Sequence, residues 1–223
     1  MDAATIRAAL VGVAVPGDAE PMRRYLKDRF PFLGVKSAAR REATKELVRP
    51  LRGDRDRIVE LVDQLWDEPE RELHQVAVDL LDANWRVLHD DDLDWLAGLV
   101  TTNAWWDSVD PLAYKVIGRA ALDRPTWWDE LDTWNDAAAT EPEMWLVRTS
   151  IIHQLGYRDD TNEQVLFDRC RRRTGDREFF IAKAIGWALR THARRRPDAV
   201  REFVDEQRDC LQPLSVCEAT KHL

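Results

Sequence analysis

Apolar residues recur along this chain at intervals of three and four positions, which is the spacing of one face of an α-helix. The spacing is clearest in three stretches: Ile58, Leu61, Val62, Leu65 and Trp66; Val76, Leu80, Ala83 and Val87; and Ile181, Ala184, Ile185, Ala188 and Leu189. Each stretch predicts an amphipathic helix whose apolar face is buried against a neighbouring element.

Residues that end helices interrupt this pattern about every 12 to 20 positions. The interruptions are Pro16-Gly17, Gly34, Pro50, Gly53, Pro69, Asp90 to Asp92, Pro125, Pro142, Gly175, Pro197 and Pro213. No strict sequence repeat is present, but a row of short helix pairs without strands is typical of HEAT-like repeats. We therefore predict an all-α fold, an α-solenoid (superhelix) of degenerate HEAT-like helical repeats, in a single domain over residues 1–223. A compact helical bundle is the alternative, and the concave face of a solenoid is the expected binding surface.

Composition supports the all-α class. The chain has 223 residues, 44% of them hydrophobic, and only 9 glycines and 10 prolines. Such a chain can bury a core but has few residues for tight turns, which nearly excludes an all-β fold. No apolar run reaches the about 18 residues needed to cross a bilayer. We expect a cytoplasmic monomer that does not bind membranes.

The cysteines indicate neither a disulfide framework nor a structural zinc site. Cys170, Cys210 and Cys217 cannot all pair with one another, and none stands in a C-x-x-C arrangement near a histidine. The acidic run at Asp90 to Asp92 and Asp94 lacks the calcium-loop pattern and fits the start of a helix better. We expect neither a metal nor a cofactor.

The formal net charge of -8 argues at first against nucleic acid as a partner. The charge is segregated, however: residues 21–57 carry +7, residues 58–147 carry -16, and residues 148–201 carry +6. This pattern fits either ordinary solvated helix faces, which charge alone favours, or a fold that brings two basic ends around one polyanion while an acidic back faces water. The basic ends contain Arg23, Arg24, Lys27, Lys36, Arg40, Arg41 and Lys45, and Arg169, Arg171, Arg172, Arg173, Lys183, Arg190 and Arg194 to Arg196. Phosphate contacts of such residues would bind a duplex without sequence specificity.

Tryptophan is unusually frequent, with 10 residues, and two pairs are adjacent: Trp105-Trp106 and Trp127-Trp128. Neighbours on a helix point about 100° apart, so one member of each pair is predicted to reach a surface or groove. Four other tryptophans are predicted to pack in the core, namely Trp66, Trp85, Trp95 and Trp134.

Five motifs spread over the chain resemble those of the AlkD-like DNA alkylation repair family, which are HEAT-repeat DNA glycosylases. They are Y-L-K-x-x-F-P-F-L-G-V at Tyr25 to Val35, W-W-D-S-V-D at Trp105 to Asp110, W-L-V-R-T-S-I-I-H-Q-L at Trp145 to Leu155, F-F-I-A-K-A-I-G-W-A-L-R at Phe179 to Arg190, and P-L-S-x-x-E-A-x-K-H at Pro213 to His222. The resemblance implies a DNA glycosylase that excises positively charged N3- and N7-alkylated purines from double-stranded DNA in base excision repair.

The resemblance also implies roles for four residues. Asp110 matches the catalytic carboxylate. Trp106 and Trp187 match an aromatic pair around the sugar of the damaged nucleotide. Arg148 matches a basic residue that contacts the DNA backbone next to that nucleotide. The chemistry is consistent with these roles. A cationic purine is already a good leaving group, so what the enzyme must stabilise is the oxocarbenium character that the sugar gains, and a carboxylate can do so.

Three of these four residues also fit a structural role. Asp110 precedes Pro111 and could cap the start of a helix. Trp187 lies in an apolar helix and fits a core position, and Arg148 could be held by an internal partner. His153 is expected to be a packed, hydrogen-bonded histidine. A noncatalytic HEAT-like scaffold that binds nucleic acid or a partner protein is therefore the alternative function.

Overall fold

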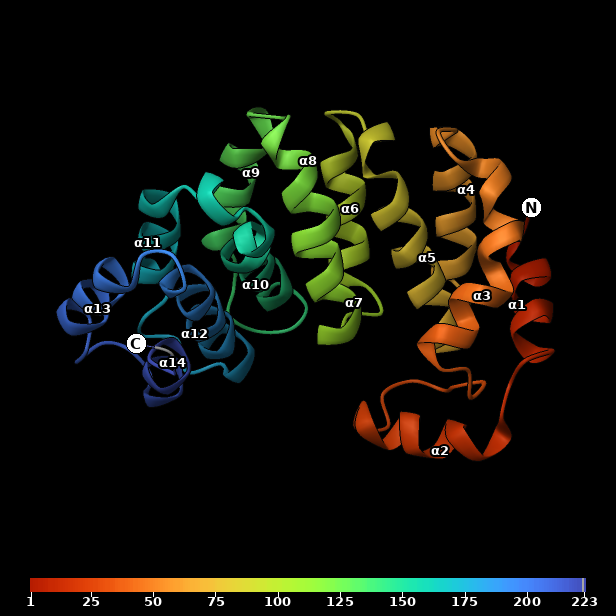
Figure 1. Ribbon diagram of the computed structural model, residues 1–223, viewed down its shortest axis with the longest axis horizontal. Coiled ribbons are helices and arrows are strands. Elements are labelled where there is room, and N and C mark those ends of the chain that lie inside the picture. Colours follow the sequence, from red (N-terminus) through yellow and green to blue (C-terminus); the bar gives the residue numbers. More distant parts are fainter. Residues whose placement is uncertain (222) are drawn as a thin grey trace. The chain divides into compact units, whose positions relative to one another are not determined.

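The computed structural model describes residues 1–221 and 223, and within this range the chain forms helices and no β-strand (Figure 1). The predicted all-α class is therefore confirmed, and short helices packed on their neighbours fit the predicted HEAT-like repeats. His222, the last residue of the C-terminal motif, lies outside the described residues. Nowhere in the described part of the chain is a helix long and apolar enough to cross a membrane.

The chain divides into two compact units, residues 1–88 and residues 89–223. The first unit contains α1 (Ala3–Val11), α2 (Pro16–Tyr25), α3 (Ser37–Val48), the short 3₁₀ helix η1 (Arg49–Leu51), α4 (Arg55–Trp66), α5 (Arg71–Asn84) and η2 (Trp85–Val87). Helix α4 packs on α5, and α3 packs on α1 and α5. The assignment of all 223 residues to a single domain remains a prediction.

The loop before α3 carries the early motif and is fixed by one buried carboxylate of the first unit. Glu72 is fully buried on α5, and its side chain accepts backbone hydrogen bonds from Leu33, Gly34 and Val35 at 2.9 to 3.1 Å. Gly34 has a φ of +91°, and a Cβ there would lie 2.4 Å from the Val15 carbonyl oxygen, so only glycine fits without strain.

The second unit contains the remaining helices. They are α6 (Asp92–Thr101), α7 (Trp106–Pro111), the π-helical segment η3 (Leu112–Ile117), α8 (Gly118–Leu122), α9 (Thr126–Asn135), α10 (Met144–Ile152), the 3₁₀ helices η4 (His153–Gly156) and η5 (Arg158–Asp160), α11 (Glu163–Arg172), α12 (Phe179–Ala193), α13 (Pro197–Glu206) and α14 (Pro213–Ala219). Helix α10 packs between α9 and α12, and α14 covers another side of α12.

The three apolar stretches lie on helices, with one error. All five apolar residues of the first stretch are buried on α4, and all five of the third are buried on α12. In the second stretch Val76 and Leu80 are buried on α5, but Ala83 is exposed and Val87 lies in η2. The helix ends at Asn84, whose side chain donates to the Leu80 carbonyl oxygen at 2.9 Å, so the spacing does not continue to Val87.

The predicted breaks agree with most helix ends. Pro16, Pro197 and Pro213 are each the first residue of a helix, where a missing N–H costs nothing. The acidic run also starts a helix: α6 begins at Asp92, whose carboxylate accepts a hydrogen bond from the His89 N–H at 2.7 Å.

The tryptophans are distributed largely as predicted. In the adjacent pairs Trp105 and Trp127 are buried, whereas Trp106 and Trp128 are only partly covered. Trp66 and Trp134 belong to the core. The core assignment of Trp85 and Trp95 is wrong, because both side chains are only partly buried: Trp85 lies in η2 and Trp95 on α6.

Candidate active site

Asp110 lies inside a helix and does not cap the start of one. The α-helical backbone continues from Trp106 through Pro111 and the π-helical segment into α8. The capping role suggested by the Asp-Pro pair is therefore wrong. Pro111 has no N–H to donate to the preceding turn, and the wider π-helical turn follows directly after it.

The start of α7 gives the two adjacent tryptophans different surroundings. Trp105 is extended, with φ -159° and ψ 160°, and packs edge-on against Trp145 and Phe180 at centroid distances of 5.7 and 5.0 Å. Trp106 is the first helical residue and lines a cavity, together with Asp110 one turn later. One buried aromatic thus anchors the helix, and the exposed one belongs to the cavity.

Arg148 binds Asp110 directly. Its Nε donates to Oδ1 of Asp110 at 2.7 Å, and its Nη2 donates to Oδ2 at 2.8 Å. Its Nη1 donates to the backbone carbonyl oxygen of Phe180, in the first turn of α12, at 2.7 Å. The guanidinium therefore links α7, α10 and α12, and a bidentate pair of this kind fixes the carboxylate plane.

Both charged groups are nearly removed from water, with side chains 12% exposed for Asp110 and 5% for Arg148. Burial raises the pKa of the Asp110 carboxyl above its usual range, while the charge and the hydrogen bonds of Arg148 oppose this rise. The sequence allowed an internal partner for Arg148. That partner is present, and it is Asp110, another of the four predicted site residues.

A cavity of about 300 Å³ brings together all four predicted site residues. Its walls are Trp106, Asp110, Arg148, Phe179, Phe180, Lys183, Trp187, Arg190 and Glu218. Trp187 is half-buried, so it is not the core residue that the apolar pattern of α12 alone suggests. Its ring meets Tyr114 edge-on at 6.2 Å and lies 6.0 Å from the guanidinium carbon of Arg148.

Sequence reasoning did not identify Glu218 or the two phenylalanines of this cavity. Phe179, Phe180 and Glu218 lie in two of the motifs that resemble the family. The resemblance therefore pointed to these positions, but it did not indicate what the three side chains do. Lys183 and Arg190 belong to the second basic end, and the sequence alone gives them no role in a cavity.

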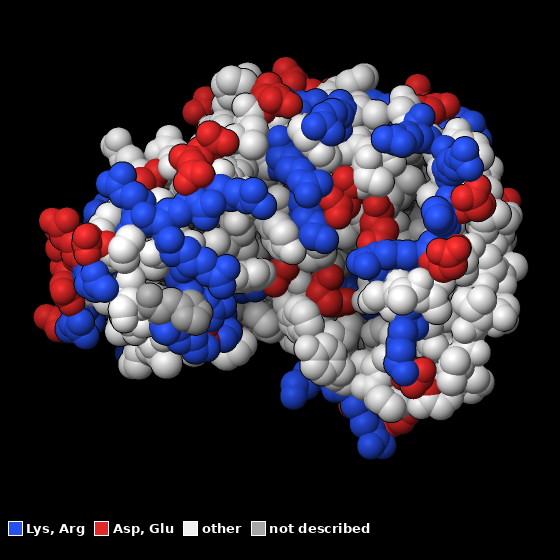
Figure 2. Space-filling view, in the orientation of Figure 1, with Lys and Arg blue, Asp and Glu red and all other residues white. Residues whose placement is uncertain are grey.

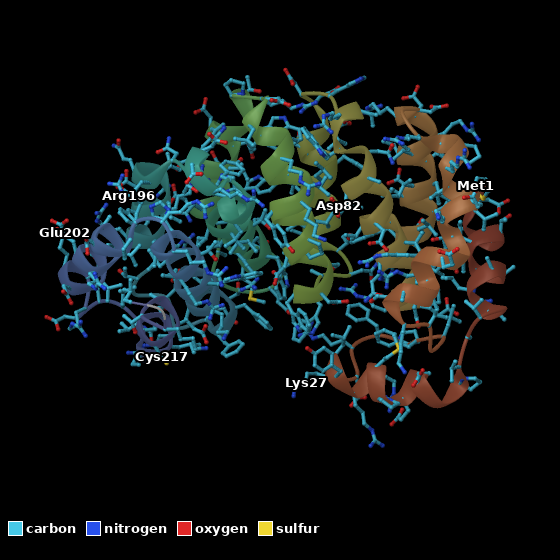
Figure 3. The ribbon with its side chains drawn as sticks, viewed as in Figure 1. Met1, Lys27, Asp82, Arg196, Glu202 and Cys217 are labelled. Carbon is cyan, nitrogen blue, oxygen red and sulfur yellow. The ribbon has the colours of Figure 1, made fainter. Side chains whose placement is uncertain are left out.

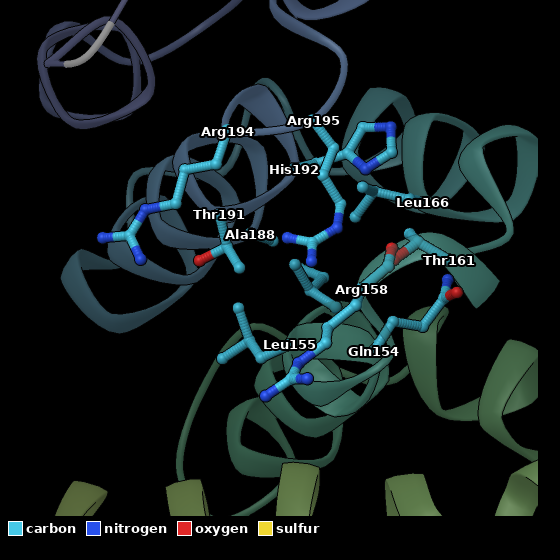
Figure 4. Close-up of a pocket in the computed structure, with 11 residues that line it drawn as sticks. Gln154, Leu155, Arg158, Thr161, Leu166, Ala188, Thr191, His192, Arg194 and Arg195 are labelled. Carbon is cyan, nitrogen blue, oxygen red and sulfur yellow. The ribbon is translucent and has the colours of Figure 1, made fainter.

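A second cavity of the same unit, about 170 Å³, lies toward the C-terminal end of α12 (Figure 4). Arg158, Arg194 and Arg195 line it, together with uncharged groups such as Gln154 and Thr191. Its described lining contains no carboxylate, and Arg195 is paired with Asp159 at 2.7 Å. It therefore lacks the acidic group that the predicted chemistry requires.

Two fully buried groups of this unit, His153 and Cys170, do not titrate near neutral pH. His153 is fully buried, its Nδ1 is 2.8 Å from the Ser150 carbonyl oxygen, and burial lowers its pKa to about 3, as expected for a packed histidine. Burial raises the pKa of the Cys170 thiol to about 12. Cys210 and Cys217 are exposed, and Cys217 is labelled in Figure 3.

In residues 1–221 and 223, no cluster of three His, Cys, Asp or Glu side chains could hold a metal ion.

Comparisons with known proteins agree over nearly the whole chain. Residues 6–223 match the sequence profile of the family described as "DNA alkylation repair enzyme". A solved structure described as a predicted DNA alkylation repair enzyme from Enterococcus faecalis is 29% identical and superposes with a TM-score of 0.83. That similarity covers 94% of this chain and 96% of the other. No curated protein sequence matches the chain.

Proposed function

Because the chain belongs to the DNA alkylation repair enzyme family, we propose that it is a DNA glycosylase that removes positively charged N3- and N7-alkylated purines from duplex DNA. Removal of the base by hydrolysis of the N-glycosidic bond would be the first step of base excision repair. The family supports a role in the repair of alkylated DNA, and the cavity around Asp110 supports the chemical step.

The observation that carries the proposal is a buried carboxylate, Asp110, that lines the same cavity as two partly buried tryptophans, Trp106 and Trp187. An alkylated purine leaves with its bonding electrons and becomes neutral, so it needs no general acid. The sugar carbon C1′ gains positive charge at the same time, and the Asp110 carboxylate stabilises that charge. The interaction is stronger in a largely desolvated cavity than in water, because less solvent screens it.

Arg148 keeps this carboxylate charged and oriented. Without a cation beside it, burial alone would favour the neutral acid. Three nitrogen atoms of Arg148 are already occupied by Asp110 and Phe180. We therefore assign Arg148 to the positioning of Asp110, while the backbone contact that the family resemblance implies for it remains a prediction.

Trp106 and Trp187 line the same cavity, and each ring has an electron-rich face. A cation over such a face gains about 0.5 to 2 kcal/mol, and a neutral base gains less. The two rings therefore favour both the cationic purine and the developing sugar cation.

This mechanism predicts selectivity for charged lesions. Neutral lesions such as uracil and hypoxanthine should be released far more slowly than 7-methylguanine or 3-methyladenine, since no general acid is assigned to protonate them. The measurement is single-turnover release from duplexes that differ only in the lesion. Release of uracil as fast as that of 7-methylguanine would contradict the assignment.

The experiment that tests the function itself is release of free 7-methylguanine or 3-methyladenine from methylated duplex DNA in the presence of a chelator. We expect release above the spontaneous rate. Duplex binding with no release would reject the glycosylase and favour a noncatalytic DNA-binding scaffold.

A further inference from the structure

Three cations share one carboxylate, and two of them, Lys183 and Arg190, line the Asp110 cavity. Glu218, on α14, accepts hydrogen bonds from Lys183 and Lys221 at Oε1, each at 2.9 Å, and from Arg190 at Oε2. The Glu218 side chain is 8% exposed, whereas those of Lys183 and Lys221 are 37% and 48% exposed. The hydrogen bonds from Lys221 and Lys183 lower the pKa of Glu218 to about 2, so the carboxylate stays ionised at neutral pH.

This arrangement leaves unused charge and unused donors at the surface. Three cations surround one anion, so the group carries a net charge of +2 at neutral pH. Each lysine has three N–H donors and the arginine has five. In the described contacts each of the three side chains donates one hydrogen bond to Glu218. Some other surface arginines of this unit each pair with a single carboxylate, such as Arg195 with Asp159 and Arg201 with Asp198.

The group lies beside the proposed nucleotide site. Lys183, Trp187 and Arg190 are spaced by four and three residues, so they share one face of α12. Lys183, Arg190 and Glu218 line the same cavity as Asp110 and Trp187. Figure 2 shows Lys and Arg side chains gathered over the last helices of this unit.

The C-terminal motif explains why the anion sits at this place. A Cβ on Gly186 would lie 2.5 Å from the Cβ of Glu218, so glycine lets α14 approach α12 closely. The Ser215 hydroxyl donates to the Ala182 carbonyl oxygen at 2.9 Å and fixes this approach. The motif P-L-S-x-x-E-A-x-K thereby supplies the shared anion and one of the cations, roles that the proposed chemistry does not use.

We propose that Lys183, Arg190 and Lys221, gathered by Glu218, form a binding site for a backbone phosphate of the DNA strand that carries the lesion. Phosphate oxygens accept the unused donors of the three cations, and the excess positive charge matches a polyanion. This inference rests on the proposed function and extends it, because it names the residues that bind the DNA strand next to the cavity in which the base is removed. Glu218 is a positioning residue, since it acts through the cations.

The test is the salt dependence of binding to an undamaged duplex, measured with the full chain carrying Lys183→Gln, Arg190→Gln or both. Each lost phosphate contact flattens the slope of log K against log salt by about 0.9. We expect about one unit for each single variant and nearly two for the double variant. Arg201→Gln is the matched control, because Arg201 is an exposed, ion-paired arginine on α13, away from the cavity, and it should leave the slope unchanged.

Wild-type slopes in both single variants would overturn the proposal and leave the group as an internal ion-pair network. Titration with inorganic phosphate at fixed ionic strength separates a site for the free ion from a site for the DNA backbone. Phosphate binding together with unchanged DNA slopes would also overturn the assignment to DNA. The binding test uses an undamaged duplex and does not depend on base removal. Flattened slopes together with no release of 7-methylguanine from methylated DNA would therefore reject the glycosylase alone.

Discussion

At the scale of single residues, two opposing effects set the charge of Asp110. Burial raises the pKa of its carboxyl, and the paired guanidinium of Arg148 opposes that rise. The proposed reaction needs the ionised form, whose fraction increases as the pH rises through the pKa. The ion pair with Arg148 is therefore expected to govern the pH range in which the protein works.

Arg148→Gln should raise the pKa of Asp110 further, because burial remains and the opposing charge is gone. Excision should fall, and it should fall more at pH 6 than at pH 9, since the midpoint of the rate profile moves to higher pH. The measurement is the single-turnover rate against pH, after subtraction of spontaneous release.

Breaking a buried ion pair also costs about 3 to 5 kcal/mol of stability. Arg148→Lys is the control for this effect, because it keeps the charge and loses only the bidentate geometry. Equal midpoints for wild type and both variants would show that Arg148 does not set the ionisation of Asp110.

Trp187→Ala should slow excision of a cationic lesion by about two- to thirty-fold, the equivalent of one cation–π contact. The salt slope of duplex binding should stay unchanged, since an aromatic ring releases no counterions. Trp187→Phe keeps a ring and should lose less. If the alanine variant excises at the wild-type rate, the ring is only part of the cavity wall.

Much of the site at this scale could be predicted from the sequence, but its contacts could not. The adjacent tryptophans required one exposed ring, and Trp106 is that ring. The pairing of Arg148 with Asp110 joins residues 38 positions apart, and no local spacing encodes such a contact. The Asp-Pro pair wrongly suggested that Asp110 caps the start of a helix. Proline also occurs inside helices, here at Pro21 and Pro111.

At the scale of helices, periodicity predicted where elements lie and missed how they end. The buried faces of α4 and α12 follow directly from their spacing. The helix predicted from the second stretch does not reach Val87. Helix α5 ends at Asn84, whose side chain donates a hydrogen bond to a carbonyl oxygen of the same helix. The close contact of α12 with α14 depends on Gly186, which resembles any other helical glycine in the sequence.

Gly186→Ala should destabilise the protein by about 1 to 3 kcal/mol, the usual cost of overpacking. The added Cβ would meet the Cβ of Glu218 at 2.5 Å and the Ser215 carbonyl oxygen at 3.0 Å, which forces α14 away from α12. Urea unfolding is the measurement. Gly98→Ala is the control: Gly98 lies on α6 with nothing within 4 Å of the new Cβ, so its replacement should be neutral or stabilise by about 0.4 to 1 kcal/mol. Equal unfolding midpoints for the two variants would contradict the packing of α14.

At the scale of the whole molecule, the charge blocks of the sequence are partly cancelled by pairing. Arg40 of the first basic end binds Asp79, and Arg172 of the second binds Asp132 and Asp136. These carboxylates belong to the acidic segment, residues 58–147, so they do not simply face water as a separate acidic surface. The sequence predicted the amount of charge in each segment, but the fold decides which charges remain unpaired.

In the proposed function the Asp110 carboxylate drives base removal, in a protein whose family is that of DNA alkylation repair enzymes. The most direct test of this role is single-turnover release of 7-methylguanine by wild type and Asp110→Asn, with duplex affinity measured in parallel. Asparagine keeps the shape and removes the negative charge, so release should fall by about two to three orders of magnitude while duplex binding persists. Release at the wild-type rate by a folded Asp110→Asn variant would contradict the account, because the carboxylate would then have no part in the chemistry.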